Sequence, residues 1–314
     1  MKQTMKNATH IEGVLYQHAL QLKTSGENSK NPGTQFISGT IDIATDDALT
    51  NIVSIHYTYV TAKTSKGNDD ARFTTLMNII NGTIGNVMEH GVDKAAKLRV
   101  DSAIGLNEFF STRTGAEELV SVKRNEGGFI HVVQTLAADE NTRSTFECDM
   151  VIYKVSRIDA DEEKSRPEQV RVSGFIFDFR KALLPVEFVV YNPKAMQYFE
   201  DLDASKSNPC FTKVSGRQIS TTVMVKSVEE GAFGEQKVTE TPRTNRDFVI
   251  TWAQAEPYTW DDESTITSQE FKAALGDREV AVAAIKQRQD DYNASKAQTQ
   301  APVAAASAPS GFNF

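Results

Sequence analysis

Cationic and aromatic residues are interleaved in two stretches of the chain, and this combination suits the binding of an unpaired nucleic-acid strand. Lysine and arginine attract phosphates, and aromatic rings stack on bases whatever their identity. The first stretch contributes as candidate binding residues Lys23, Lys30, Tyr57, Tyr59, Lys63, Lys66 and Arg72. The second contributes Arg171, Phe175, Phe177, Arg180, Lys181, Lys213, Arg217, Arg243 and Arg246.

Each of these residues also has a purely structural interpretation. Tyr57 and Tyr59 lie two positions apart in a run typical of a strand, so both should point to one side, which is either a binding face or the core. Phe175, Phe177 and Phe179 share a strand face and first suggest core packing, because three exposed phenylalanines would promote aggregation unless they bind something. The lysines and loop arginines are equally compatible with a solvated surface.

Motifs that would indicate catalysis are absent from the sequence. It contains no Walker loop, no G-x-G-x-x-G and no H-E-x-x-H motif. The five histidines are scattered, and neither Cys148 nor Cys210 has a histidine at metal-ligand spacing. Glu162 and Lys164 form half of a nuclease-like E-x-K pattern, but they lie in a charged run typical of a solvated loop. We therefore expect no enzymatic activity, no metal and no cofactor.

The composition limits the partners and the location. The chain has 314 residues, 39% of them hydrophobic, and a formal net charge of −8. This length suffices for about two domains. The acidic balance excludes a polybasic protein that binds duplex by bulk charge, although it permits a local basic groove. No apolar run is long enough to span a membrane, and residues 1–10 lack the apolar stretch of a signal peptide, so we expect a cytoplasmic protein.

Strand patterns dominate most of the chain, and they occur in the same order twice. Val14–Tyr16 and Val151–Tyr153 each open one half, and Ile37–Ile41 in the first half matches Val172–Ile176 in the second. Both halves continue with a strand, a short helical pattern and two more strands. Three strands, a helix and two strands is the order of the OB-fold, a five-stranded Greek-key barrel. We therefore predict a mostly β protein with two OB-like five-stranded barrels and short helices.

The predicted organisation continues beyond the barrels. The predicted domains are a first OB-like barrel in residues 1–144, a second in 145–256, an acidic helical segment in 257–293 and a disordered Ala/Pro/Ser tail in 294–314. A glycine in the second strand of each barrel, Gly39 and Gly174, suits sharp bending. We expect Ser268 to cap the helix, Trp252 to lie in a core and Trp260 to pack between barrel and helical segment.

The segment Phe36–Ala44, its counterpart Val172–Ile176 and the tail ending in Phe314 make the chain resemble phage-encoded single-stranded DNA-binding proteins. The resemblance implies tandem OB-folds and a non-catalytic protein that binds single-stranded DNA in replication, recombination or repair. It also implies that the C-terminal tail recruits replication or recombination proteins. The candidate residues for this recruitment are Phe312 and Phe314, for which a chance ending is the alternative interpretation.

A second class of function fits the same strand pattern. A β-rich structural or assembly protein of a virion would also show many strands and no catalytic motif. It would not need interleaved cations and aromatic residues, or a tail with an aromatic tip. Single-stranded DNA binding is therefore the leading hypothesis, with virion assembly second and an enzyme with an unrecognised site third.

Overall fold

The N-terminal half forms a closed five-stranded barrel in the computed structural model, which describes residues 5–27, 29–161, 166–229, 233, 237–261 and 266–299. β1 pairs antiparallel with β3 and β5, β3 with β4, and β5 with β6, and a parallel pairing of β4 with β6 closes the ring. The strands are β1 (Asn7–His18), β3 (Gln35–Ala44), β4 (Ile52–Thr61), β5 (Lys97–Ser111) and β6 (Glu118–Val133), with β2 (Gln21–Thr24) on the edge of β3. We call this unit barrel 1.

The second half, which we call barrel 2, repeats this arrangement strand for strand. β7 pairs antiparallel with β8 and β10, β8 with β9, and β10 with β11, and a parallel pairing of β9 with β11 closes the ring. The strands are β7 (Ser144–Ile158), β8 (Gln169–Phe177), β9 (Leu183–Val190), β10 (Cys210–Glu229) and β11 (Lys237–Ala253).

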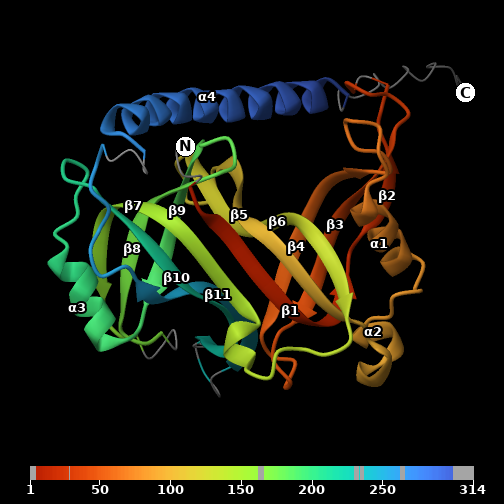
Figure 1. Ribbon diagram of the computed structural model, residues 1–314, viewed down its shortest axis with the longest axis horizontal. Helices are drawn as coiled ribbons and strands as arrows, with labels where there is room; N and C mark the ends of the chain where they lie inside the picture. The colour runs from red at the N-terminus through yellow and green to blue at the C-terminus, as the bar shows by residue number, and fades with distance from the viewer. Residues whose placement is uncertain are drawn as a thin grey trace, which may run out of the picture.

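In both barrels the helical elements lie between the third and fourth strands of the ring. These elements are α1 (Ala71–Ile80), α2 (Val87–His90) and a 3-10 turn (Val92–Lys94) in barrel 1, and α3 (Pro193–Asp201) in barrel 2. This is the order of an OB-fold. The predicted fold class, mostly β with two OB-like barrels, is therefore confirmed (Figure 1).

The two barrels are joined through their first strands, after a link that contains a 3-10 turn (Glu140–Thr142). β1 pairs antiparallel with β7 from Asn7↔Cys148 to Ile11↔Ser144, so hydrogen bonding continues from one barrel into the other. The side-chain amides of Asn125 on β6 and Gln218 on β10 also exchange two buried hydrogen bonds of 2.8 and 3.0 Å. The Asn125 amide also donates to the Ser54 carbonyl at 3.2 Å. Because these buried amides are hydrogen-bonded across the junction, the contact fixes how the walls of the two barrels meet.

Gly39 and Gly174 occupy equivalent places in the second strand of each barrel. A Cβ atom on Gly39 would lie 2.2 Å from the carbonyl oxygen of Ala19, and one on Gly174 would lie 2.5 Å from that of Val151. Gly39 also has a φ of +133°, a conformation that favours glycine. Both glycines thus allow another segment of backbone to approach closely, as expected where a small barrel bends sharply.

Gly39→Ala is expected to destabilise the protein by about 1–3 kcal/mol, the usual range for an overpacked site. The new methyl group would meet a backbone oxygen, which cannot rotate aside as a side chain can. Chemical denaturation followed by circular dichroism measures the change. Gly26→Ala is the matched control, because nothing lies within 4 Å of the Cβ that it adds. Equal denaturation midpoints for the two variants would contradict the expected clash.

The chain after β11 returns across the outer face of barrel 2. We call residues 254–261 and 266–275 the C-terminal cover. Tyr258 and Trp260 pack on Phe211, with ring centroids 4.8 and 5.4 Å apart, and Trp260 also contacts Phe271 at 5.5 Å. Ile266 completes this cluster. The predicted place of Trp260, between barrel and helical segment, is confirmed.

The long helix α4 (Ser268–Thr299) starts in the C-terminal cover and lies across both barrels (Figure 1). Its cap is Thr267 rather than the predicted Ser268. The Thr267 hydroxyl accepts from the Glu270 backbone N–H at 3.1 Å, and the Glu270 carboxylate accepts from the Thr267 N–H at 2.9 Å, which is a capping box. The helix also continues to Thr299, inside the stretch predicted to be disordered, because alanine, lysine and glutamine favour helix.

α4 is attached to the far end of the β5–β6 hairpin by polar contacts. Arg278 forms a bidentate ion pair with Glu108, and Lys286 contacts Glu117 at 2.6 Å. The side-chain amide of Gln289 donates to the Phe110 carbonyl at 2.7 Å and accepts from its N–H at 2.8 Å, as a neighbouring strand would. The helix therefore bridges barrel 2, where it begins, and barrel 1.

Two aromatic residues expected in a core are exposed. Trp252 is 52% exposed, because it faces outward near the end of β11, and Phe179 is exposed because β8 ends at Phe177, before reaching it. The prediction of a core position was wrong for both. No helix in the described part of the chain is long and apolar enough to cross a membrane.

Candidate nucleic-acid interface

Two aromatic rings lie together on the outer face of barrel 1. Phe36 on β3 and Tyr59 on β4 have ring centroids 4.5 Å apart, and Tyr59 is 47% exposed. They lie on the second and third strands of the OB-fold, the face on which such barrels bind oligonucleotides and oligosaccharides. We call this pair the aromatic platform. Phe36 is half-buried, so Tyr59 supplies most of the open ring surface, on which bases of any identity can stack.

Several of the predicted cations lie on β2 or in the loops that follow β2 and β4, next to the strands of the aromatic platform. Lys23 on β2 lies directly opposite Phe36 in the β2–β3 register, so the two side chains share a face. The Tyr59 hydroxyl lies 3.3 Å from the Ser25 hydroxyl, which ties the ring to the loop that also carries Lys30. Lys30, Lys63 and Lys66 are exposed, and Lys63 pairs with Asp69 at 2.6 Å.

Tyr57 does not belong to the aromatic platform, which corrects the prediction that it binds. Its side chain is 2% exposed inside barrel 1, where burial raises its pKa. The register between β3 and β4 shifts by one residue next to Gly39, and this irregularity breaks the alternation between Tyr57 and Tyr59. Tyr59 consequently points outward although it lies two positions after an inward residue.

Arg72 is engaged within the fold at the start of α1. Its guanidinium donates to both carboxylate oxygens of Asp70, the N-cap residue, at 3.0 and 2.6 Å, and these bonds raise its pKa. It also lies over the ring of Phe129, 5.6 Å from the centroid. Arg72 therefore supports the helix start and is not a free cation.

The corresponding face of barrel 2 is occupied by the chain itself. Phe175 packs between Tyr153 and Phe271, with ring centroids 5.0 and 6.1 Å away. Phe177 is 0% exposed in the cluster beneath the C-terminal cover. The prediction that Phe175 and Phe177 stack on bases is corrected, because the C-terminal cover already packs on their side of β8. Arg171, on the same strand, approaches Glu187 at 3.4 Å.

The loop cations of barrel 2 are dispersed. Arg180 and Lys181 lie in the turn after β8, where Arg180 sits over the exposed ring of Phe179 at 4.9 Å. Arg246 is exposed on β11. The side chain of Arg243 lies outside the described residues.

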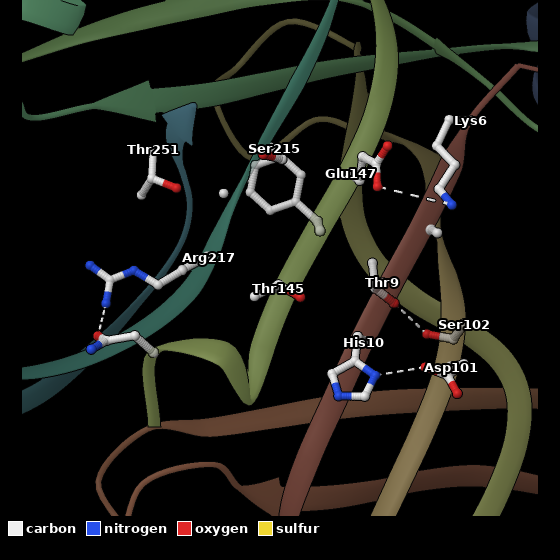
Figure 2. A pocket seen from close by; sticks show the side chains of 14 residues that line it. Lys6, Thr9, His10, Asp101, Ser102, Thr145, Glu147, Ser215, Arg217 and Thr251 are labelled. Carbon is white, nitrogen blue, oxygen red and sulfur yellow. Dashed lines mark hydrogen bonds and ion pairs between the residues drawn. The ribbon is translucent and has the colours of Figure 1, made fainter. Parts of the chain in front are cut away.

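A hollow of about 880 Å³ opens where β1 meets β7 and β10, and hydroxyl groups such as those of Thr9 and Ser102 line it (Figure 2). The cations on and beside it are neutralised or hydrogen-bonded by neighbouring side chains. The pairs are Lys6 with Glu147 at 4.0 Å, Lys213 with Glu147 at 3.3 Å, and Arg217 with Asn141. Asp101, hydrogen-bonded to His10 at 2.7 Å, adds a second carboxylate to the lining. The hollow therefore lacks the excess positive charge that a nucleic-acid strand requires.

Sequence reasoning missed Phe36, although the signal was present. Phe36 alternates with Ile37, and its side of the strand continues with Ser38, Thr40 and Asp42, so the polar neighbours indicate an outward face. The predicted tail residues Phe312 and Phe314 lie outside the described residues. Among the described residues, no three His, Cys, Asp or Glu side chains form a group that could hold a metal.

Comparisons with known proteins give a family and a distant structural likeness. The family model described as YorF matches residues 6–288. No curated protein matches the chain. A crystal structure of a deletion mutant of the single-stranded DNA binding protein from Thermus aquaticus is similar with a TM-score of 0.45 and 9% sequence identity, over 82% of this chain and 99% of that one.

Proposed function

Because the chain belongs to the YorF family, whose name states no activity, we propose a function from the surfaces of the chain itself. It binds single-stranded DNA without base preference. The strand lies on the outer face of β3 and β4, and its bases stack on the aromatic platform. Lys23 and the loop lysines contact the phosphates. The protein acts without catalysis, in the cytoplasm, in DNA replication, recombination or repair.

The observation that carries the proposal is the ring pair of exposed Tyr59 and half-buried Phe36 on the second and third strands of an OB barrel. Aromatic surface left open to solvent loses the stabilisation of burial, so the exposed part of this pair favours a ligand with flat apolar surfaces. Nucleobases have such surfaces, and the neighbouring lysines supply the positive charge that the phosphates need.

The overall charge supports a preference for single strands over duplex. A net charge of −8 opposes bulk attraction to a duplex, in which the phosphates of both strands are negatively charged. In a duplex the bases are stacked on one another, so the aromatic platform has no free base to contact. The proposal assigns this binding to barrel 1, because the C-terminal cover occupies the matching face of barrel 2. The C-terminal tail, with Phe312 and Phe314, is the part that we propose contacts replication or recombination proteins.

Titrating a fluorescently labelled oligo-dT strand with the protein tests this function directly. We expect tight binding whose affinity falls with salt, since each neutralised phosphate contributes a slope of about −0.7 in log K against log salt. A matched duplex should bind far more weakly. An oligo-U strand of the same length decides between DNA and RNA preference. Absence of oligo-dT binding even at low salt would refute the proposal.

A further inference from the structure

A second hollow separates the two barrels on the side of β4 and β6. We call this hollow of about 680 Å³ the inter-barrel cleft. One wall is the outer side of β4 and β6, and the other consists of β10 and β11 near Gln218 and Arg246. The paired amides of Asn125 and Gln218 join the walls. The cleft therefore has fixed walls, one from each barrel.

The inter-barrel cleft is positively charged on an acidic protein. Among its lining residues, Lys123, Arg124 and Arg246 are cations and Asp247 is the single carboxylate. Asp247 accepts a hydrogen bond of 3.2 Å from the Tyr191 hydroxyl. The lining carries an excess of two positive charges, which Glu126 beside Arg124 reduces to one, whereas the whole chain has a net charge of −8.

The three cations differ in how far the protein satisfies them. Arg124 pairs with Glu126, with nitrogen–oxygen distances of 2.5 and 2.7 Å. Lys123 lies over the rings of Phe188 and Phe248, 5.6 Å from each centroid, and burial lowers its pKa. Arg246 is exposed and makes no ion pair or side-chain hydrogen bond with any residue that the structure describes. It is thus the cation available to an incoming anion.

His56 on β4 lines the inter-barrel cleft, and its pKa responds to the charges there. Burial lowers its pKa first, and the charges of Arg124 on β6 and Arg246 on β11 lower it further. Asp42 on β3 and Glu126 on β6 oppose these effects without outweighing them. The imidazole is therefore neutral at pH 7, and an anion placed between the arginines would favour its protonation.

The inter-barrel cleft continues the surface that carries the aromatic platform. His56 precedes Tyr59 by three positions on β4, a separation of roughly 10 Å along a strand. Single-strand sites on one OB barrel extend over about 4–16 nucleotides, so a strand stacked on the platform reaches this distance. We propose that the inter-barrel cleft binds a phosphodiester group of the same single strand, with Arg246 as the residue that contacts it. The inference rests on the proposed function of the aromatic platform.

Arg246→Ala tests this proposal, with Arg288→Ala as the matched control. Arg288 is exposed on α4, where its one side-chain bond to the described residues is to the carbonyl of Ala284 in its own helix, so its replacement removes the same charge elsewhere. For oligo-dT of about 12 nucleotides, within the range of single-strand sites, Arg246→Ala should reduce the slope of log K against log salt by about 0.7, the loss of one phosphate contact. The slope of the control should equal that of the wild type.

Three outcomes distinguish failure of the proposed function from failure of the inter-barrel cleft proposal. If wild-type protein binds no oligo-dT, both the proposed function and this inference fail. If it binds and Arg246→Ala has the same slope and affinity as Arg288→Ala, only the inter-barrel cleft is refuted. If inorganic phosphate alone at equal ionic strength shifts the His56 titration as much as DNA does, the cleft binds free phosphate and the proposal is overturned.

The titration of His56 by NMR provides a readout independent of affinity. Binding of the strand should raise the pKa of His56, because a phosphate offsets the repulsion from Arg124 and Arg246. By linkage, affinity should then rise as the pH falls from the bound pKa toward the free pKa. An unchanged His56 pKa on saturation with oligo-dT would contradict the proposal.

Discussion

Tyr59→Ala is expected to weaken oligo-dT binding by about 5- to 150-fold, because stacking on one aromatic ring contributes about 1–3 kcal/mol per base. Phe36→Ala should have an effect of similar size. The two rings touch, with centroids 4.5 Å apart. The losses of binding free energy in the two single variants should therefore not add up to the loss in the double variant. Because Tyr59 is half exposed, its replacement should leave the thermal unfolding of the protein nearly unchanged.

Fluorescence anisotropy with a labelled oligo-dT strand measures this effect, and two variants serve as controls. Tyr292→Ala removes an exposed tyrosine on α4, far along the chain from the platform, and should leave the affinity unchanged. Tyr59→Phe keeps the ring and loses only the 3.3 Å contact with Ser25, so it should retain most of the affinity. If Tyr59→Ala binds as tightly as Tyr292→Ala, the aromatic platform is not where the bases stack.

The barrel topology was predictable because it follows from local signals. Alternation of apolar and polar residues defines each strand, and the order of strands and helices is sufficient to name an OB-fold. Gly39 and Gly174 stood out at matching positions, and the close backbone approach at both explains why glycine is needed there. Repetition of one pattern in both halves made the prediction stronger than either half alone.

The faces of individual residues were less predictable, since one irregular residue reverses them. Alternation placed Tyr57 and Tyr59 on the same side, and the register shift beside Gly39 separates them. Capping is similarly local: Thr267 and Ser268 are both good caps, and the reciprocal bond to Glu270 decides for Thr267. These choices depend on geometry that a period of two does not contain.

Contacts between distant segments could not be predicted at all from local pattern. Phe175 and Phe177 do point away from the interior of barrel 2, as their interleaving with Arg171 suggested. They are unavailable because Phe271, almost a hundred positions later, packs above them. The inter-barrel cleft likewise exists only because β6 and β10 approach each other. No sequence motif predicts that Lys123, Arg124 and Arg246 line the same cleft.

Replacing Arg278 with alanine is expected to weaken the attachment of α4 to barrel 1 strongly. Arg278 pairs with Glu108 by two hydrogen bonds, and the side chain of Glu108 is only 7% exposed between α4 and the β5–β6 hairpin. Removing one partner of a buried pair leaves an uncompensated charge, which costs about 3–5 kcal/mol. We expect this cost to appear as release of the C-terminal half of α4 from barrel 1, detected by faster hydrogen exchange in the β5–β6 hairpin.

The pH dependence identifies the buried carboxylate as the cause of that loss. In the wild type burial raises the pKa of Glu108, but the hydrogen bonds from Arg278 and Ser121 and the charge of Arg278 outweigh burial and lower it. A lowered pKa stabilises the fold at neutral pH, and this stabilisation is lost as the pH falls through the folded pKa.

In Arg278→Ala burial acts against Ser121 alone, so protonation relieves the unpaired charge. The difference in stability between the two proteins should therefore be largest at pH 7 and shrink as the pH falls from above the ordinary pKa of a glutamate, where the variant's Glu108 takes up its proton, to below it, where the wild type's does. Arg288→Ala, on the same helix without a buried partner, should show no such dependence. A difference that stays constant from pH 7 to acid would mean that lost packing, and not the charge of Glu108, accounts for the effect.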